Sequence, residues 1–408
     1  MQILFLTDNF PPEANAPAAR THAHCREWAR KGARVTVITC APNFPQGRVY
    51  EGHSNRPYQV EEVDGIRVVR VWSYIAANAG FAKRIADYVS FAGSAFVAGL
   101  FQAADVIVAT SPQLFTTVGA MALSVARRKP WVFELRDLWP DSIRAVSAMS
   151  HPRVLDGLEA LEKFLYRRAD LIVAVSPAFK TNLVSRGIDA SKIEIVTNGA
   201  DLEMFTPRAA DPELTAELGI DGKLVVGYVG THGMAHNLEA IVGAAHRLDD
   251  GNTVLLLIGD GARKQAVAEI VRSAGARNVL LLDPVPKEQI ARYWSVIDVA
   301  LVPLRRDPVF TTVIPSKIFE AAAMGKPILL GVDGQAREIV EGHDIGVRYE
   351  PDNMDDFVAK VELLRSDRAL YQRLADNGPR MAKQFDRKEL AARMYGYLEE
   401  LVRQHQPS

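Results

Sequence analysis

Short, continuous apolar runs recur along the chain and alternate with segments of helical period. Apolar runs without polar alternation are typical of strands covered on both faces, as in parallel sheets. The predicted strands are residues 3–7, 35–39, 66–71, 106–109, 131–135, 171–175, 193–196, 224–229, 254–258, 279–282, 299–302 and 328–330. The predicted helices are residues 18–31, 113–128, 150–168, 238–248, 265–274, 287–294 and 387–404. This alternation predicts right-handed crossovers and doubly wound α/β sheets.

The strand–helix pattern occurs as two sets in series. The turn residues Asn198-Gly199 and the breaker Pro207 mark a connector between the sets. A chain of 408 residues is also longer than one ordinary core requires. We expect two Rossmann-like domains, residues 1–203 and 204–385, facing a cleft, and a C-terminal helix over 386–408 that packs back on the first domain. Ligands of such folds bind outside the carboxyl ends of the strands.

Composition narrows the class of protein. The formal net charge is −1, so nothing global attracts nucleic acid. The two cysteines, Cys25 and Cys40, form no CxxC pair, and no Cys, His, Asp or Glu cluster has metal-site spacing. The first apolar run follows Met1 without a basic segment and is too short for a signal peptide. We expect a cytoplasmic protein without a bound metal.

One segment suggests contact with a membrane. The run from Tyr88 to Ala104 contains no charged residue, and Lys83 and Arg84 stand just before it. Its length approaches the lower limit for a spanning helix, but it is rich in Gly, Ala and Ser. It fits a helix packed inside the first domain, a helix lying in the membrane surface, or, least well, a true span.

The segment IPSKIFEAAAMGKPILLG, residues 314–331, carries the most chemistry. It predicts a short helix that opens on Pro315, Ser316 and Lys317, with Glu320 about one turn further on. A helix N-terminus and a lysine suit a diphosphate, and a carboxylate suits a pair of sugar hydroxyls. The alternative is an ordinary crossover helix with a proline in its first turn and a capping serine.

Three further strand ends in the second domain offer ligand-binding groups. The loop VGTHGMAHN contains Gly230, Thr231 and His232, and the next strand runs into Gly259, Asp260 and Gly261. Glycines permit close backbone approach, and Thr and His donate to phosphate. After the third strand, Val285 lies between two prolines, an apolar lip for a flat base. Each loop by itself is equally an ordinary turn, and the spacing is not that of a dinucleotide fingerprint.

The first domain has two candidate segments. The loop after the first strand contains Asn15 and Ala16 in place of a glycine-rich phosphate turn, so it is either a structural turn or part of the acceptor site. The segment FELRDLWPDS places Arg136 and Asp137 directly after a buried strand. Such charges need either a structural partner or a function in acceptor binding or proton transfer.

Taken together, these segments resemble a GT-B glycosyltransferase of family 4. The resemblance spans the whole chain and is carried by FPPEANAPAARTHAH, FELRDLWPDSI, VGTHGMAHNLE, the GDG turn, the NGAD connector and PSKIFEAAAMGKPIL. It is closest to the bacterial branch that includes N-acetyl-L-fucosamine transferases of O-antigen and capsule assembly. No serine-hydrolase elbow and no P-loop is present.

The resemblance implies roles for particular residues. Glu320 matches the glutamate that binds the nucleotide ribose, and Ser316 and Lys317 fall at the diphosphate. Val285 falls near the uracil. The family's first glutamate falls at Thr312, which is not acidic, so this donor-sugar contact departs from the family pattern.

Further departures follow from the same comparison. The family has a pair of basic residues after the second domain's first strand, and this chain lacks the pair. His232 and Asn237 stand in that region instead. Its catalytic-region histidine falls near Arg136, with Asp137 beside it, and its Gly-Gly loop near Asn15 and Ala16.

The resemblance also implies the reaction. A UDP-sugar would donate a sugar, such as N-acetyl-L-fucosamine or a related amino or deoxy sugar, to a polyprenyl-diphosphate-linked saccharide at the inner face of the cytoplasmic membrane. Family members are retaining and need no metal or other cofactor. Two alternatives stay open: a UDP-sugar epimerase of the same architecture, and a catalytically silent partner in a membrane glycosyltransferase complex.

Overall fold

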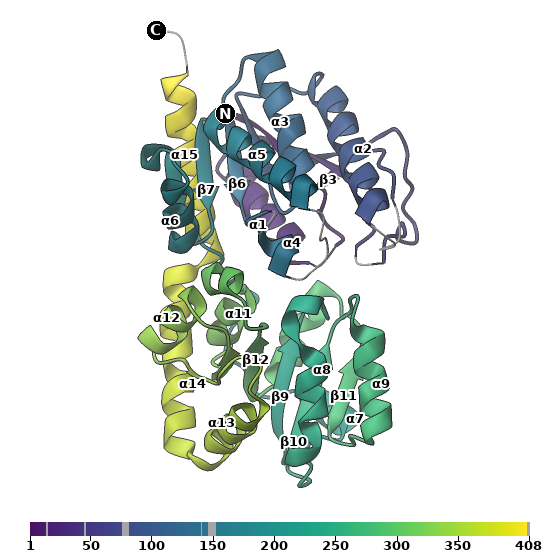
Figure 1. The fold of residues 1–408 in the computed structure, drawn as a ribbon, viewed down its shortest axis with the longest axis vertical. Helices are drawn as coiled ribbons and strands as arrows, with labels where there is room; N and C mark the ends of the chain where they lie inside the picture. The colour runs from purple at the N-terminus through teal and green to yellow at the C-terminus, as the bar shows by residue number, and fades with distance from the viewer. Residues whose placement is uncertain (14, 45, 76–80, 140, 146–151, 406–408) are drawn as a thin grey trace. The chain divides into compact units, whose positions relative to one another are not determined.

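The computed structural model describes residues 1–13, 15–44, 46–75, 81–139, 141–145 and 152–405. They form two compact units, Met1–Thr197 with Arg387–Ser408, and Asn198–Asp386 (Figure 1). Ser150, the predicted start of one helix, and residues 406–408 of the predicted C-terminal segment lie outside the described residues. Both units have the predicted doubly wound α/β architecture.

The first unit contains an eight-stranded sheet in the order β3-β4-β2-β1-β5-β6-β7-β8. Its neighbouring strands are parallel except for the antiparallel pair β3 and β4. The strands are β1 Gln2–Leu6, β2 Arg34–Cys40, β3 Tyr58–Val63, β4 Ile66–Val71, β5 Val106–Thr110, β6 Trp131–Leu135, β7 Leu171–Ala174 and β8 Ile193–Ile195.

Helices cover both faces of this sheet. They are α1 Ala16–Arg30, α2 Phe81–Gly99, α3 Leu114–Arg127, α4 Asp141–Ala145, α5 Pro152–Arg168, α6 Pro177–Ser185 and α15 Arg387–Gln404. One apolar cluster joins the sheet to α2, α3 and α5 through Phe91, Leu123 and Tyr166. The opposite cluster contains Trp28 of α1 and Met394 of α15. Burial on both faces explains why the strands are continuously apolar.

The C-terminal helix α15 belongs to the first unit. Its Leu390, Met394 and Leu398 are buried in the cluster that contains Trp28. The Nε1 of Trp28 donates a hydrogen bond to the carbonyl of Ala391 at 2.9 Å. The contact joins the first and the last helix of the unit, since α1 and α15 pack together.

The second unit contains a parallel six-stranded sheet in the order β11-β10-β9-β12-β13-β14. Its strands are β9 Leu224–Val229, β10 Thr253–Ile258, β11 Val279–Leu282, β12 Val299–Pro303, β13 Ile328–Gly331 and β14 Gly346–Arg348. Its α-helices are α7 Pro212–Leu218, α8 Leu238–Gly243, α9 Lys264–Ala274, α10 Ile290–Ser295, α11 Lys317–Ala323, α12 Gln335–Gly342, α13 Met354–Ser366 and α14 Arg368–Ala382.

The structure corrects several predicted elements. The strands β3 and β14 were not predicted, since neither is a continuous apolar run. The predicted helix 238–248 ends as α8 at Gly243 and continues as a 3-10 turn, and the predicted helix 287–294 likewise opens with a 3-10 turn. The helix predicted from Tyr88 to Ala104 ends at Gly99, because the guanidinium of Arg127 donates to the carbonyls of Gly99, Leu100 and Gln102.

Candidate functional site

The candidate donor site lies where the strand order of the second unit reverses. The chain leaves β9 toward β10 on one side, and returns to add β12 on the other side of β9. Loops from neighbouring carboxyl ends separate at such a point and leave room for a ligand. Here the loop after β9 and the loop after β12 are joined, because the Arg305 amide donates to the carbonyl of Ala235 at 2.8 Å.

The two predicted glycine turns interlock at this edge. The His232 amide donates to the carbonyl of Asp260 at 2.8 Å, and the Gly230 amide donates to Ile258 at 2.9 Å. Gly259 has a φ of 147°, and a Cβ built there would lie 1.9 Å from the carbonyl oxygen of Gly230. Only glycine fits this approach, so the pairing of the two turns accounts for the sequence GDG.

Lys317 brings the predicted helix segment to the same place. Its Nζ has no exposed surface and no hydrogen-bond partner. The nitrogen lies 3.5 Å from the ring centroid of Tyr228, a cation–π contact, and 3.1 Å from the Cβ position at Gly230. Burial lowers the pKa of Lys317 to about 7, and the negative charge of Glu320 opposes that shift.

The segment around Lys317 differs in detail from the prediction. The helix α11 begins at Lys317, and Ser316 makes no side-chain capping hydrogen bond. Pro315 accepts the Ile318 amide through its carbonyl, and Glu320 is half-buried in the first turn. The capping role considered for the serine is therefore wrong, and its hydroxyl is not used to hold the helix start.

Tyr228 connects the remaining donor-side residues. Its hydroxyl donates to the carbonyl of Thr231 at 2.6 Å. The rings of His232 and His236 have centroids 5.8 and 5.6 Å from that of Tyr228. His232 was expected here, whereas His236 was missed, because the 3-10 turn that returns it to Tyr228 was not predicted. The spacing His-x-x-x-His in THGMAH is the signal that could have found it.

The other predicted donor residues lie along the same sheet edge. Asp260 accepts the Gly261 amide at 2.7 Å and so shapes its own turn. Val285 is half-buried in the loop after β11, two strands away from β9. Lys264 links the two loops, because its Nζ donates to the carbonyl of Gly259 at 2.8 Å and pairs with Asp283 at 2.5 Å. The structure thus groups Gly230, His232 and Lys317 closely, and places Val285 further along.

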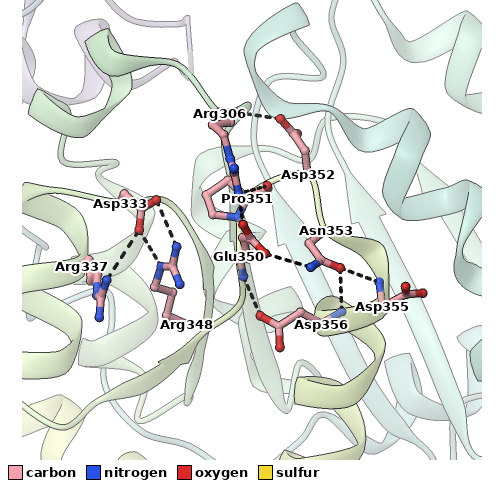
Figure 2. Close-up of polar contacts among 10 residues, drawn as sticks. All are labelled: Arg306, Asp333, Arg337, Arg348, Glu350, Pro351, Asp352, Asn353, Asp355 and Asp356. Carbon is pink, nitrogen blue, oxygen red and sulfur yellow. Dashed lines mark hydrogen bonds and ion pairs between the residues drawn. The ribbon is translucent and has the colours of Figure 1, made fainter.

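A polar network joins the loops that follow β9, β12 and β14. Figure 2 shows Arg306 between Asp352 and Glu350, and Asn353 donating to Glu350 at 2.9 Å. The Asn237 side chain donates to the same Asp352 at 2.8 Å. Asn237 has a φ of 48°, which ends the loop after β9 in a left-handed turn. The network therefore positions both loops that flank Lys317.

In the first unit, Arg136 and Asp137 follow β6 as predicted. Both backbone amides bond the Ser111 hydroxyl, at 2.8 and 3.2 Å. The guanidinium of Arg136 donates to the carbonyl of Pro17 at 3.2 Å, and burial lowers its pKa to about 10. Asp137 accepts the Ser142 hydroxyl at 2.9 Å, and burial raises its pKa to about 6.

The buried ion pair of this region is formed by other residues. Arg20 of α1 donates to Glu134 at 2.9 Å, with both side chains almost fully buried. Its guanidinium also donates to the carbonyls of Val196 and Thr197. Burial raises the pKa of Glu134, but the charges of Arg20 and Arg136 outweigh burial and hold the pKa below its ordinary value. Arg20 was not predicted.

The loop after β1 is held by side-chain hydrogen bonds. Asn15 is the N-cap of α1, since its Oδ1 accepts the Ala18 amide at 2.9 Å, and its amide group donates to Asn9. Ala16 is the first residue of the helix. Asp8, which precedes this loop, has its pKa raised to about 6 by burial. Asp8 and Asp137 are thus two carboxyl groups that take up a proton at a higher pH than an exposed aspartate does.

Among the described residues, no group of three His, Cys, Asp or Glu side chains is arranged to hold a metal ion. Within the same part of the chain, no helix is both long enough and apolar enough to cross a membrane.

Comparison with protein families shows the class of protein to which this two-domain fold belongs. Residues 15–199 match the family described as Glycosyl transferase 4-like domain, and residues 211–381 match Glycosyl transferases group 1. The two matches cover nearly the whole of both units. The chain belongs to the GT-B glycosyltransferases of family 4, group 1.

Two relatives with named functions are similar to this chain in sequence. The chain is 25% identical over 376 residues to WcaI of Escherichia coli K12, named as a colanic acid biosynthesis glycosyl transferase, covering 88% of this chain and 91% of that protein. It is 25% identical over 235 residues to a Bacillus subtilis protein named for teichuronic acid biosynthesis, TuaH, with 57% of each chain covered.

Solved structures share the fold at lower identity. Sucrose-phosphate synthase from Thermosynechococcus elongatus has a TM-score of 0.80 at 17% identity and covers 98% of both chains. Anabaena HepE in complex with UDP and glucose has a TM-score of 0.72 at 18% identity, over 98% of this chain and all of that one.

Proposed function

We propose that this protein transfers a sugar from a UDP-sugar to a lipid-linked saccharide during assembly of a cell-surface polysaccharide. The donor sugar we favour is N-acetyl-L-fucosamine or a related amino or deoxy sugar. The work of WcaI and TuaH, as their names describe it, supports polysaccharide assembly. The complex of HepE with UDP-glucose supports a uridine nucleotide as carrier.

The observation that carries the proposal is the placement of Lys317. An enclosed cation without a hydrogen-bond partner is unfavourable unless an anion joins it. The nitrogen lies beside the Gly230 backbone at the switch point, where a diphosphate fits. Sugar transfer leaves negative charge on the departing UDP, and a fixed cation there stabilises the transition state without a metal ion. We assign the ribose to Glu320 and the uracil to Val285.

The first unit supports the acceptor half of the proposal. Asp137, a half-buried acid whose pKa burial raises to about 6, is our candidate for contact with the acceptor hydroxyl. The sequence-based assignment puts Arg136 and the Asn15-Ala16 turn on the same acceptor side.

An apolar groove suits a lipid-held acceptor. It has a volume of about 670 Å³ and is lined by residues of β3, β4 and α2, including Tyr58 and Val97, and by Trp72, which directly follows β4. Phe101 at its rim is 81% exposed, and Lys83 and Arg84 at the start of α2 are exposed. Apolar side chains with basic neighbours favour attachment to an anionic membrane surface. We therefore propose that the protein works on the inner face of the cytoplasmic membrane.

The test is thermal unfolding of the purified protein with UDP, GDP, ADP or NAD, each with and without EDTA. Ligand at about 100 times its dissociation constant adds about 2.7 kcal/mol to stability. We expect UDP alone to raise the midpoint, EDTA to have no effect, and Glu320→Ala to remove the shift. Glu341→Ala, an exposed acid on α12, is the matched control and is expected to keep it.

Other outcomes select the alternatives. A protein stabilised by no nucleotide would be the silent partner in a glycosyltransferase complex, an alternative that Thr312 in place of an acid favours. Interconversion of free UDP-sugars without transfer to an acceptor would establish the epimerase.

A further inference from the structure

Three basic side chains surround one buried aromatic ring in the second unit. The Nζ of Lys317 lies 3.5 Å from the ring centroid of Tyr228. The rings of His232 and His236 approach the same tyrosine at centroid distances of 5.8 and 5.6 Å. The three come from the loop after β9 and from α11, so the fold gathers them at the switch point. We call Lys317, His232 and His236 the basic cluster.

Nothing in the described part of the chain neutralises the cluster directly. Both ring nitrogens of His232 and the Nζ of Lys317 are buried without a hydrogen-bond partner. Neighbouring charges are largely committed to other partners: Lys264 pairs with Asp283, and Asp260 accepts the Gly261 amide. Three buried cations in such a space would repel one another and lose their hydration.

The surrounding groups keep the cluster weakly charged. Burial, together with the charges of Lys264 and Lys317, lowers the pKa of His232 to about 4, while Asp260 opposes the shift. Burial and Lys317 lower the pKa of His236 to about 3. Burial brings the pKa of Lys317 to about 7, and only Glu320 opposes this shift. At neutral pH both histidines are neutral and the lysine carries about half a charge.

Two other ionisable groups stand near the cluster. Arg263, at the start of α9, pairs with Glu239 of α8. The hydroxyl of Tyr228 donates to Thr231, and burial raises its pKa well above the ordinary value, so it stays neutral. Neither group supplies the missing counter-charge.

We propose that the basic cluster binds the diphosphate of the donor with uptake of protons, so that donor affinity is coupled to pH through Lys317 and the two histidines. The inference rests on the proposed function and adds His236 to the donor site. An anion within a few ångströms favours the protonated form of each base. The protons are taken from solvent when the diphosphate binds and return to solvent when UDP leaves.

The test is titration calorimetry of the full chain with UDP in two buffers of different ionisation enthalpy. The buffer dependence of the heat gives the protons taken up per UDP. We expect close to one proton above about pH 7, and an affinity that falls by up to about tenfold per pH unit toward about pH 9. Uridine, which lacks the phosphates, should bind without this uptake.

Two variants locate the proton. Lys317→Arg keeps the charge but does not titrate, so the uptake above neutral pH should disappear. Lys326→Arg is the matched control, because Lys326 is also a buried lysine with lowered pKa, but it donates to the Ser295 carbonyl. Below about pH 6 we expect the two histidines to take up further protons when UDP binds, and His236→Asn should reduce this additional uptake.

The outcomes separate the two proposals. UDP binding with no net proton uptake, or with uptake unchanged in Lys317→Arg, overturns the proton-coupled cluster and leaves the transferase proposal standing. Complete absence of UDP binding overturns both.

Discussion

At the scale of single residues, Lys317 and Arg20 show two ways to bury a cation. Arg20 meets Glu134 and two backbone carbonyls, which together satisfy its guanidinium. Lys317 has no hydrogen-bond partner and lies against the face of Tyr228, where cation–π contact repays part of the lost hydration. The first arrangement stabilises the fold, whereas the second keeps a binding group ready at a cost in stability.

That difference gives a prediction for Lys317→Met. The pKa of Lys317 falls from 10.5 to about 7 on folding, so between these values the unfolded chain binds more protons than the folded one. The stability of the wild type therefore rises with pH across this window. We expect the methionine variant to be more stable than the wild type near pH 7, by a few kcal/mol at about 1.4 kcal/mol per pKa unit.

Urea unfolding at several pH values measures this effect. The two proteins should converge above about pH 11, where the lysine is mostly neutral in both states. A variant that is less stable than the wild type at neutral pH would show that the ammonium is not destabilising where it lies.

At the scale of elements, helix α14 packs on α11 through a glycine. A Cβ at Gly378 would lie 2.6 Å from the carbonyl oxygen of Ala322, so this contact needs a residue without a side chain. The glycine therefore sets how closely α14 packs on α11, the helix that begins at Lys317. Gly396 of α15, by contrast, has nothing within 4 Å of its Cβ position.

The two glycines predict opposite effects of the same substitution. Gly378→Ala should destabilise the protein by about 1–3 kcal/mol, because backbone must shift to admit the methyl group. Gly396→Ala should stabilise it by about 0.5–1 kcal/mol through helix propensity alone. Chemical denaturation of both variants measures the difference. Equal effects on stability would contradict the tight packing of α14 on α11.

The elements also show what the sequence reveals by itself. Strands such as β6 and β9 were predicted with their observed bounds, because burial on both faces leaves a continuous apolar run. Strand β3 was missed since it is an edge strand whose side chains are largely exposed. The hairpin Asp64-Gly65, with both φ values positive, was its only local signal.

The sequence predicted the candidate site to a similar degree as the fold. Lys317 and the glycine turns stood out because a helix start and strand ends are local patterns. His236, Arg20 and the enclosure of Lys317 by Tyr228 depend on contacts between segments far apart in the sequence. No local pattern encodes such contacts, and they appear only once the loops have been placed.

At the scale of the whole molecule, the apolar groove predicts membrane attachment. The double variant Val97→Glu with Phe101→Glu should weaken binding to vesicles that contain anionic phospholipid by at least about tenfold, because burying one large apolar side chain contributes about 1.5–3 kcal/mol. Val125→Glu on α3 is the control, since Val125 is also exposed but does not line the groove. Vesicle sedimentation measures the binding.

Two results would contradict this prediction. Equal binding of the double variant and the wild type would assign attachment to another surface. A wild type that binds no vesicles would remove the membrane from the proposed function.

The return of α15 to the first unit also sets an order of events during synthesis. The first unit buries Trp28 and Phe5 against residues 390–401, which are made only after the whole of the second unit. A ribosome-bound chain that has just completed β8 therefore exposes this apolar face, and the face stays exposed while the second unit is made and closes its own sheet. The unit that begins the chain is the last to finish folding.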